Sequence, residues 1–471
     1  MKTSWLAVIG LSAVLLLAGC GEDPNERANA LYVAADRQAQ AMREGAKGYT
    51  EALEAYRAVR KDIERIISKY DTSELAVRLV SGEARVAGMT LIEFRALEAA
   101  LEALAGAEQD PIEAALVLGD TLDEEYVRDS VITGVARAYA QSGRLEQAGA
   151  LIERSRDATT RAGIYQALAK AYQDAGQARV AGELLEQAHA SLLGQTPDRW
   201  RGLSSVRAAQ TALELGHKEV AERLYALSLA QHDSSAGADA DVGLLVVQSE
   251  FLLASGERER ALELLAQASD APGARRSLRE LALGYAVHGQ GERALEIIDS
   301  MPEGYERAMA LLDAAERLEA REHHTQAGEM RRHALEASRG LDDPFWKGFL
   351  LVRLAGQYTQ AGQSAQAREL IDEALPWVRV LEAGSRGIHL AGAARELALA
   401  EAPAEARALV SEALESLRHA EHRRTAAYAL LAIGRAQADG AGTLDARARE
   451  ALAALVIEAQ PMHGLWHSRG H

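Results

Sequence analysis

A short spacing of small, apolar and glycine positions recurs along this 471-residue chain. Each copy has a small residue, an aromatic or apolar residue three positions later, usually a glycine four positions after that, and an alanine five positions further on. The eight clear copies are Ala136/Tyr139/Gly143/Ala148, Ala169/Tyr172/Gly176/Ala181, Ala209/Ala212/Gly216/Ala221, Ser249/Leu252/Gly256/Ala261, Ala282/Tyr285/Gly289/Ala294, Ala315/Leu318/Glu322/Ala327, Ala355/Tyr358/Gly362/Ala367 and Ala394/Leu397/Glu401/Ala406. Four positions kept in register eight times indicate an internal repeat.

The spacing predicts an antiparallel helix pair in each copy. The small residue and the aromatic residue three positions later lie on one face of a first helix. The glycine ends that helix, because a residue without a Cβ suits a left-handed cap. The alanine then lies early in a second helix and lets it approach the first closely. Apolar steps such as Ala181/Leu184/Leu185/Ala188 continue the buried face of the second helix.

The repeat comes in two lengths. The glycine positions are separated by 33, 40, 40, 33, 33, 40 and 39 residues. Seven residues are about two helical turns, so the second helix or its exit can lengthen while its buried face stays in phase.

A basic residue stands eight positions before the small residue in most copies. It either forms a ladder that binds an acidic partner or packs along the preceding helix as part of the repeat, and we favour the second interpretation because every copy places it alike. The residues are Arg128, Arg161, Arg201, Arg307, Lys347, Arg386 and Arg424, whereas Asp241 and Ala274 occupy the site in two copies.

Composition and charge agree with thin helical repeats. The chain is 48% hydrophobic but has only 22 aromatic residues and 9 prolines, so its core must consist largely of alanine and leucine on uninterrupted helices. With 52 basic and 69 acidic residues, the net charge of −17 argues against a nucleic-acid partner. A single cysteine excludes an intrachain disulfide and a four-cysteine zinc site.

The set of small, Tyr, Gly and Ala positions, with the later pair Leu185 and Ala188, resembles the tetratricopeptide repeat family. The resemblance covers about residues 110–440, with a ninth, decayed copy from near Arg424. The resemblance implies an all-α fold, a tetratricopeptide-like α-solenoid of antiparallel helix pairs forming a curved superhelix. The early tryptophan of that family is absent, its late proline is mostly absent, and Glu322 and Glu401 replace the turn glycine.

The expected organisation has five parts. Residues 1–19 are a signal peptide, 20–30 a lipidated tether, 31–110 a degenerate helical repeat with a cap, 111–457 the solenoid and 458–471 a tail. The segment 48–56 looks like the second helix of a repeat, and 66–76 resembles connectors of envelope tetratricopeptide lipoproteins, in which a Tyr-x-x-Ser turn precedes a helix. Asp110-Pro111 begins another second helix, since Ala115 lies 33 residues before Ala148.

The N-terminus has the layout of a secretory signal. Lys2 precedes an apolar run from Leu6 to Ala18 that is too short to span a bilayer comfortably. Leu17-Ala18-Gly19-Cys20 resembles the lipobox of bacterial lipoproteins, which implies lipidation of Cys20 and cleavage before it. Several acyl chains anchor a protein stably where one does not. In proteobacterial lipoproteins an Asp after the cysteine favours the inner membrane, so Gly21 points to the outer membrane, periplasmic face.

Motifs for chemistry are scarce. No phosphate loop, Gly-x-Ser-x-Gly elbow, His-Glu-x-x-His motif or calcium loop occurs, which weighs against an enzyme. We expect no cofactor and no metal. Two histidine groups could hold a metal but are more simply solvated side chains: His323, His324, Glu329 and His333 on one second helix, and His463, His467 and His471 in the tail.

The groove is the better candidate site. In tetratricopeptide arrays the first helices line the concave surface and hold partner peptides. The register places Arg137, Lys170, Gln173, Arg207, Gln210, Glu250, Arg279, Asp313, Glu316, Arg353, Gln360 and Arg395 on that face. We therefore expect a non-enzymatic, membrane-anchored scaffold of the bacterial cell envelope that binds an envelope protein or peptide in its groove. The alternative is a ligand- or metal-binding solenoid accessory to an envelope enzyme, for example in peptidoglycan synthesis.

Overall fold

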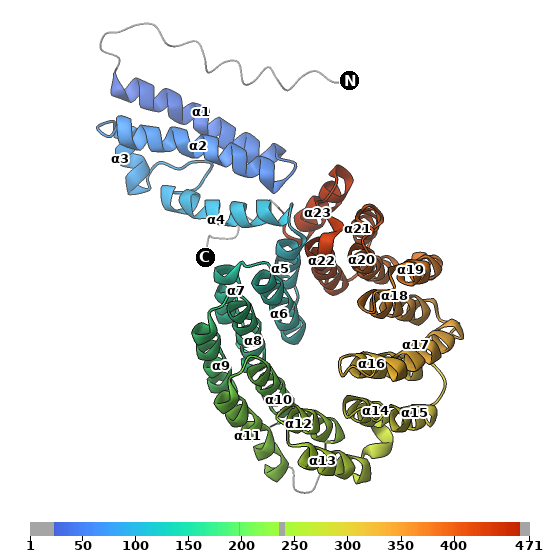
Figure 1. The fold of residues 1–471 in the computed structure, drawn as a ribbon. Helices are drawn as coiled ribbons and strands as arrows, with labels where there is room; N and C mark the ends of the chain where they lie inside the picture. Colours follow the sequence, from blue (N-terminus) through green and yellow to red (C-terminus); the bar gives the residue numbers. More distant parts are fainter. Residues whose placement is uncertain (1–22, 197, 235–240, 462–471) are drawn as a thin grey trace. The chain divides into compact units, whose positions relative to one another are not determined.

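The computed structural model describes residues 23–196, 198–234 and 241–461, and these are all-α (Figure 1). The one extended pairing in the described ranges is an isolated bridge between Val86 and Met89. The described chain divides into two compact units, one ending at Ala105 and the other spanning Gly106–Gln460. The predicted all-α solenoid of antiparallel helix pairs is confirmed in the second unit.

The first unit holds α1 (Pro24–Gly45), α2 (Tyr49–Lys69), α3 (Glu74–Ser81) and most of α4 (Leu91–Ala107). The rings of Tyr56 and Phe94 stack at 4.6 Å between α2 and α4, and the Tyr56 hydroxyl donates to the Phe94 carbonyl over 2.9 Å. The predicted turn at Tyr70 is present: the Ser73 hydroxyl donates to the Tyr70 carbonyl and accepts from the Ala76 amide, so it caps α3.

The predicted tether needs a correction at its C-terminal end. Residues 24–30 are the first two turns of α1, and Ala28 in this stretch is fully buried. The Asp23 carboxylate accepts from the Asn25 amide and Pro24 takes the first helical position. This is the same Asp-Pro start signal that begins α5, so the polar composition of residues 21–30 concealed a helix start.

The second unit is a row of helix pairs with an inner and an outer layer (Figure 1). The inner helices are α6 (Glu125–Gln141), α8 (Ala158–Asp174), α10 (Arg199–Glu214), α12 (Val242–Ala254), α14 (Leu278–Val287), α16 (Tyr305–Glu319), α18 (Pro344–Gln360), α20 (Ala383–Leu399) and α22 (Arg423–Ala436). The outer helices are α7 (Leu145–Ala150), α9 (Ala178–Leu193), α11 (Lys218–Ser234), α13 (Arg258–Asp270), α15 (Gly291–Asp299), α17 (His324–Arg339), α19 (Ser364–Arg379) and α21 (Pro403–Leu417).

All eight predicted turn positions adopt left-handed backbone. The six glycines have φ between +72° and +91°. Glu322 and Glu401, which replace glycine in two copies, keep the same conformation at φ of +64° and +60°. A residue with a Cβ is disfavoured there, so the geometry of the helix pair overrides the local preference of these two residues.

The two repeat lengths follow from the outer helices. The copies spaced by 39 or 40 residues contain outer helices of 16 or 17 residues, namely α9, α11, α17 and α19. The copies spaced by 33 residues contain α7, α13 and α15, with 6, 13 and 9 residues. The outer helix or its exit was expected to take up the extra two turns: beside α7 and α15 the long outer helices are longer by seven residues or more, whereas α13 is only three or four residues shorter than they are, so its exit takes up the rest of the difference.

The recurring basic residue is a structural part of the repeat. Its side chain donates to a backbone carbonyl six to eight residues earlier in the sequence. That carbonyl lies at the C-terminal end of the preceding outer helix or in the segment that follows it, where a positive charge is favourable. The recorded bonds are Arg128 to Leu122 (3.1 Å), Arg161 to Ser155 (3.2 Å), Arg201 to Gln195 (2.9 Å), Lys347 to Arg339 (2.8 Å) and Arg386 to Arg379 (3.3 Å). Arg307 instead pairs with the Asp299 carboxylate.

The row of helix pairs closes on itself, which the repeat pattern does not predict. The first helix of the unit, α5 (Pro111–Asp120), packs against α22 as the outer helix of a pair, and α22 also contacts α6 as neighbouring inner helices do (Figure 1). Leu431 of α22 reaches the backbone of Gly134 in α6, and Arg424 lies 3.8 Å from the Glu124 carboxylate. The last repeat thus takes its inner helix from the C-terminal end and its outer helix from the N-terminal end of the unit, so the solenoid is a ring.

The final helix, α23 (Ala446–Ala459), does not complete the last repeat. A π-helical turn, η4 (Gln437–Ala441), follows α22, and Gly440 within it has φ of +113°. The chain then turns away, and α23 packs against both α21 and α5. It fills the outer layer between these two helices and so covers the junction from outside.

Candidate functional site

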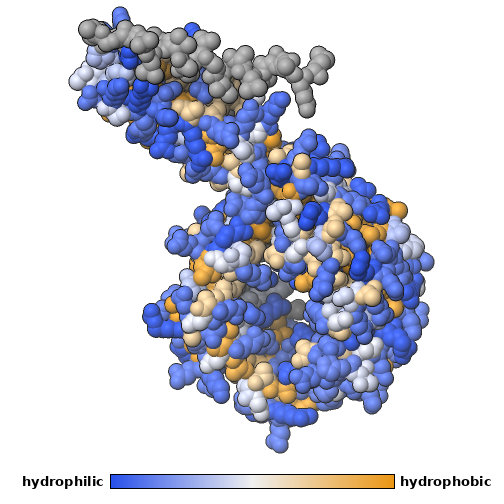
Figure 2. Space-filling model, turned by 45° about the horizontal axis from the view of Figure 1, so that its top comes forward, coloured by the Kyte–Doolittle hydropathy of each residue, from blue (hydrophilic) through white to orange (hydrophobic). Residues whose placement is uncertain are grey.

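The twelve residues predicted for the groove all lie on inner helices, but their exposure differs. Arg137, Lys170, Arg207, Arg279, Glu316 and Gln360 are exposed; Gln173, Gln210, Asp313, Arg353 and Arg395 are partly buried; Glu250 is buried. Figure 2 shows a hollow at the centre of the ring and hydrophilic residues over much of the visible face. Because the row closes, the surface predicted as an open groove is the inner wall of a ring.

Part of the predicted set forms one charge network across three inner helices. Asp313 of α16 accepts from Arg279 of α14 and from Arg353 of α18, the latter over 2.9 Å. Arg353 also contacts the Glu316 carboxylate at 3.2 Å. These arginines are therefore neutralised within the ring and hold adjacent repeats together, which leaves them poorly suited to capture an acidic partner.

Glu250 lies in a pocket of the inner wall that spans four helices. The pocket has a volume of about 410 Å³ and includes Gln210, Glu214, Arg317 and Arg321. The Arg317 guanidinium of α16 donates to Glu250 of α12 over 2.9 Å, past the intervening short helix α14. Burial raises the pKa of the Glu250 carboxyl, and the nearby Arg317 opposes that shift.

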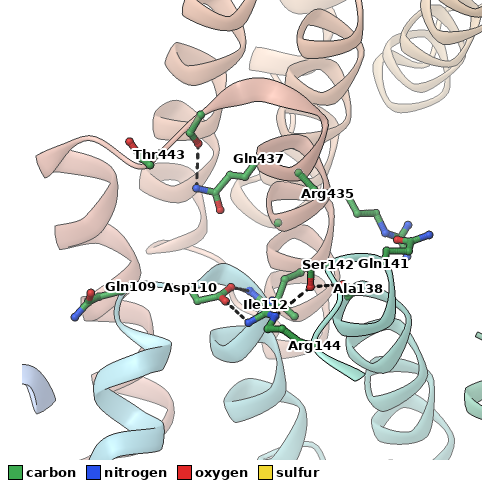
Figure 3. Close-up of a pocket in the computed structure, with 13 residues that line it drawn as sticks. Gln109, Asp110, Ile112, Ala138, Gln141, Ser142, Arg144, Arg435, Gln437 and Thr443 are labelled. Carbon is green, nitrogen blue, oxygen red and sulfur yellow. Dashed lines mark hydrogen bonds and ion pairs between the residues drawn. The ribbon is translucent and has the colours of Figure 1, made fainter. Parts of the chain in front are cut away.

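A second cavity, of about 480 Å³, lies where the ring closes (Figure 3). It is lined by residues from both ends of the unit, and several of its polar side chains are bound within the wall: Arg144 donates to Asp110 over 2.7 Å, and Gln437 donates to the Gly442 carbonyl over 3.2 Å. Arg435 reaches from α22 toward Gln141 of α6. We call this cavity the seam cavity.

Arg435, which lines the seam cavity, interacts electrostatically with an arginine of each neighbouring inner helix. Burial lowers the pKa of the Arg435 guanidinium, the nearby Arg137 of α6 and Arg395 of α20 lower it further, and the nearby Asp439 of η4 opposes the shift. Arg395 is held by Asp439 of η4 over 2.6 Å and lies 3.5 Å from Glu396. Arg137 and Arg435 have no hydrogen-bonded or ion-paired acid among the described residues. Sequence reasoning found Arg137 and Arg395 but missed Arg435, because the ninth repeat is too decayed to align.

The rim of the ring carries a third cavity, of about 410 Å³, that sequence reasoning did not find as a site. The rings of Tyr305 and Trp346 stack there at 4.0 Å and 8°, next to Met301 and Met309. Arg279 lines this cavity and also belongs to the charge network with Asp313 on the inner wall. Trp346 therefore packs against Tyr305, whereas Trp200 is 68% exposed.

The described residues contain no group of three or more His, Cys, Asp and Glu side chains placed to hold a metal. His323 occupies the N-cap position of α17 without a capping hydrogen bond from its side chain, and His324 lies 2.6 Å from Glu319, which also accepts from Arg331. Cys20 and its lipobox, and the tail histidines His463, His467 and His471, lie outside the described residues. Among the described helices, none is both long and apolar enough to pass through a bilayer.

Comparison with known proteins gives little beyond the fold. No protein-family model matches the chain, and no curated protein matches its sequence. Nine chains of solved structures match. One of them, described as "Circular tandem repeat protein with novel repeat topology and enhanced subunit contact surfaces", is 15% identical over 84% of this chain and 85% of that chain, with a TM-score of 0.19. The packing of its own helix pairs identifies this chain as a helical-repeat scaffold, a fold that commonly serves protein interaction.

Proposed function

We propose that this chain is a lipid-anchored, tetratricopeptide-like scaffold of the bacterial cell envelope that holds a segment of a partner protein inside its ring. The observation that carries the proposal is the inner wall. Nine inner helices line it, and it presents exposed Arg137, Lys170 and Arg207 together with two polar cavities. Convergent polar groups in concave pockets are typical of binding sites.

A ring constrains the partner more than an open groove does. An open superhelix can accept a folded domain from its side, whereas a closed ring admits only a chain end, a hairpin or a slender helix unless it opens. We therefore expect the bound part of the partner to be a linear segment, and we expect affinity to come from a few anchor side chains rather than from a large buried area.

The membrane part of the proposal rests on the sequence Leu17-Ala18-Gly19-Cys20. Replacing Cys20 with Ser should release the protein from membranes in fractionated cells, because diacylglyceryl attachment requires the thiol. Continued membrane association of the variant would contradict the lipid anchor without touching the ring. Sucrose-gradient separation of the two membranes would test the expected outer-membrane location.

The binding part is tested by photo-crosslinking in intact cells. A photoreactive amino acid at Lys170, on the inner wall, should capture a partner protein, whereas the same residue at Glu222, exposed on the outer helix α11, should not. Capture of the same proteins from both positions would contradict binding inside the ring. Substituting Lys170 and Arg207 with Glu is the complementary test, because Arg207 has no acid partner among the described residues, unlike Arg353.

A ligand-binding solenoid that assists an envelope enzyme is the second candidate, and the Glu250 pocket is the observation that favours it. A buried carboxylate beside Arg317 and Arg321 offers both charges to a small zwitterionic ligand. Calorimetric titration of the whole protein with free amino acids and cell-wall muropeptides would test it. Binding that Glu250→Gln abolishes would support this candidate over the scaffold.

A further inference from the structure

Helix α3 of the first unit is apolar on two faces. Leu75, Ala76 and Leu79 are buried, whereas Val77 and Val80, one turn apart on the helix, are 60% and 63% exposed. A helix that is apolar all round is normally covered on every side. The outer face of α3 therefore lacks the cover that its sequence favours. We call the surface formed by Val77 and Val80 the α3 face.

The α3 face lies at the end of the first unit where α1 begins. The backbone amide of Glu74, the first residue of α3, donates to the side-chain oxygen of Asn25 in the first turn of α1 over 2.9 Å. Val77 follows Glu74 by one helical turn. A further valine, Val33, is 45% exposed in the N-terminal half of α1. The start of α1 and the α3 face are therefore neighbours in space.

The start of α1 is also close in sequence to the proposed site of lipidation. Cys20 precedes Asn25 by five residues. Five residues span at most about 18 Å when they are fully extended. Acyl chains on Cys20 would lie in the hydrocarbon of the bilayer. So short a link keeps the start of α1, and with it the α3 face, close to the membrane surface.

The first unit is the part of the chain that an anionic membrane repels least. Residues 23–105 contain 12 basic and 14 acidic residues, so they carry −2 of the chain's net charge of −17. Beside the two valines, Arg78 is exposed, and its contact with the Glu83 carboxylate is long, at 3.9 Å. The aliphatic stem of an arginine can lie along an apolar surface while its guanidinium stays at the polar boundary. The surroundings of the α3 face thus suit a lipid surface.

We propose that the α3 face is a membrane-contact surface, and that Val77 and Val80 insert at the interface of the bilayer in which Cys20 is anchored. This inference rests on the proposed lipid anchor and adds a second, non-covalent contact to it. A lipid on a short link leaves a protein free to tilt and rotate. A second contact fixes which side of the first unit faces the lipid, and its strength grows with the apolar area that it buries.

The test uses the chain from Cys20 onward, with one tetradecyl chain attached through a maleimide to Cys20, the only cysteine. A single chain of this length gives marginal, reversible membrane binding, so a second contact changes the bound fraction measurably. The measurement is co-sedimentation with vesicles of phosphatidylethanolamine and a minority of phosphatidylglycerol. Val77→Ser/Val80→Ser should weaken the partition about fivefold, the effect of losing partial burial of two valine side chains.

The matched control is Ile92→Ser in the same unit. Ile92 is 79% exposed in the first turn of α4. The carbonyl of Ala87, five residues earlier, accepts from Arg43 in the last turn of α1 over 3.1 Å, so this region lies at the far end of α1 from Cys20. Ile92→Ser should change the partition by less than about twofold. Equal losses for Ile92→Ser and the double variant would overturn the α3 face in favour of general apolar attraction.

A gain of binding keeps the proposal falsifiable if a substitution disturbs folding. Val77→Trp places a side chain that favours the membrane interface at an exposed position, so it should strengthen the partition about threefold. Unchanged or weaker partition of Val77→Trp, in a protein that melts as the wild type does, would overturn the contact.

Two further results separate the inference from its alternatives. Release of Cys20→Ser from cell membranes, together with unchanged vesicle partition of Val77→Ser/Val80→Ser, would remove the α3 face from the membrane while the lipid anchor stands. Analytical ultracentrifugation of the chain without the tetradecyl group tests a second copy as the occupant. A dimer that Val77→Ser/Val80→Ser dissociates would overturn the membrane in favour of that copy.

Discussion

Gly434 of α22 lies directly against Ile112 of α5. A Cβ placed on Gly434 would overlap the Ile112 Cδ1 and lie 2.5 Å from its Cγ1. The two residues are 322 positions apart in the sequence, so this contact joins the two ends of the repeat unit. A glycine in a helix is unfavourable by itself, and here it allows the approach that closes the ring.

Gly434→Val should therefore open or loosen the ring. Overpacking of this kind costs about 1–3 kcal/mol. We expect a larger radius of gyration in solution scattering and a lower free energy of unfolding in urea. The control is Gly328→Val on α17, where a Cβ would meet nothing within 4 Å. An unchanged radius of gyration for Gly434→Val would mean that closure does not depend on this contact.

The left-handed glutamates give a prediction of opposite sign. Glu322→Gly and Glu401→Gly should each stabilise the protein by about 1 kcal/mol, because glycine removes the Cβ strain at φ of +64° and +60°. The same exchange at Glu222, exposed within helix α11, should destabilise it by about 1 kcal/mol. Urea unfolding of the three variants decides the matter, and destabilisation by Glu322→Gly would contradict the backbone argument.

The recurring basic residue should matter most where it is buried. Arg201 is only 5% exposed, and its Nη1 donates to the Gln195 carbonyl over 2.9 Å. Arg201→Ala should lower the free energy of unfolding by about 2 kcal/mol, through a lost hydrogen bond to a charged group and lost packing of its stem. Arg207→Ala, six residues later on the same helix, should stay within about 0.5 kcal/mol. Equal effects would refute a structural role for the ladder.

Glu250 should give the protein a specific dependence on pH. Burial raises the pKa of its carboxyl above the ordinary value of 4.5, so between that value and the raised one the folded state binds more protons than the unfolded state. This group therefore makes its most favourable contribution to stability at low pH and loses it as pH rises through the raised pKa. As the pH rises through the raised pKa, the free energy of unfolding of Glu250→Gln should therefore increase relative to that of the wild type. A difference that is flat with pH would contradict the raised pKa.

The sequence predicted the parts of the fold that repeat. Spacing alone located the left-handed turns, because each is encoded within one repeat by neighbouring residues, and it revealed the two repeat lengths. It also predicted the structural role of Arg201 and its counterparts, since every copy places the basic residue alike.

Closure could not be predicted in this way. The contact with α5 is encoded by Gly434 in the most decayed copy, and no periodic signal connects this residue with Ile112. For the same reason Arg137 was assigned to the wall of an open groove, while its neighbour Arg435 went unnoticed. The start of α1 at Pro24 was readable in principle, because Asp23-Pro24 repeats the signal of Asp110-Pro111.

The pairing of α5 with α22 also sets the order in which the ring can be completed during synthesis. The apolar face of α5, with Ile112, Ala115 and Leu118, leaves the ribosome early, and its covering helix follows some 300 residues later. Until then that face is exposed, and bringing the ends together costs conformational entropy that grows with the logarithm of the intervening length. A chain truncated before α22 would therefore keep its other helix pairs but expose the apolar face of α5. Premature termination of translation should then yield protein that aggregates rather than a smaller functional scaffold.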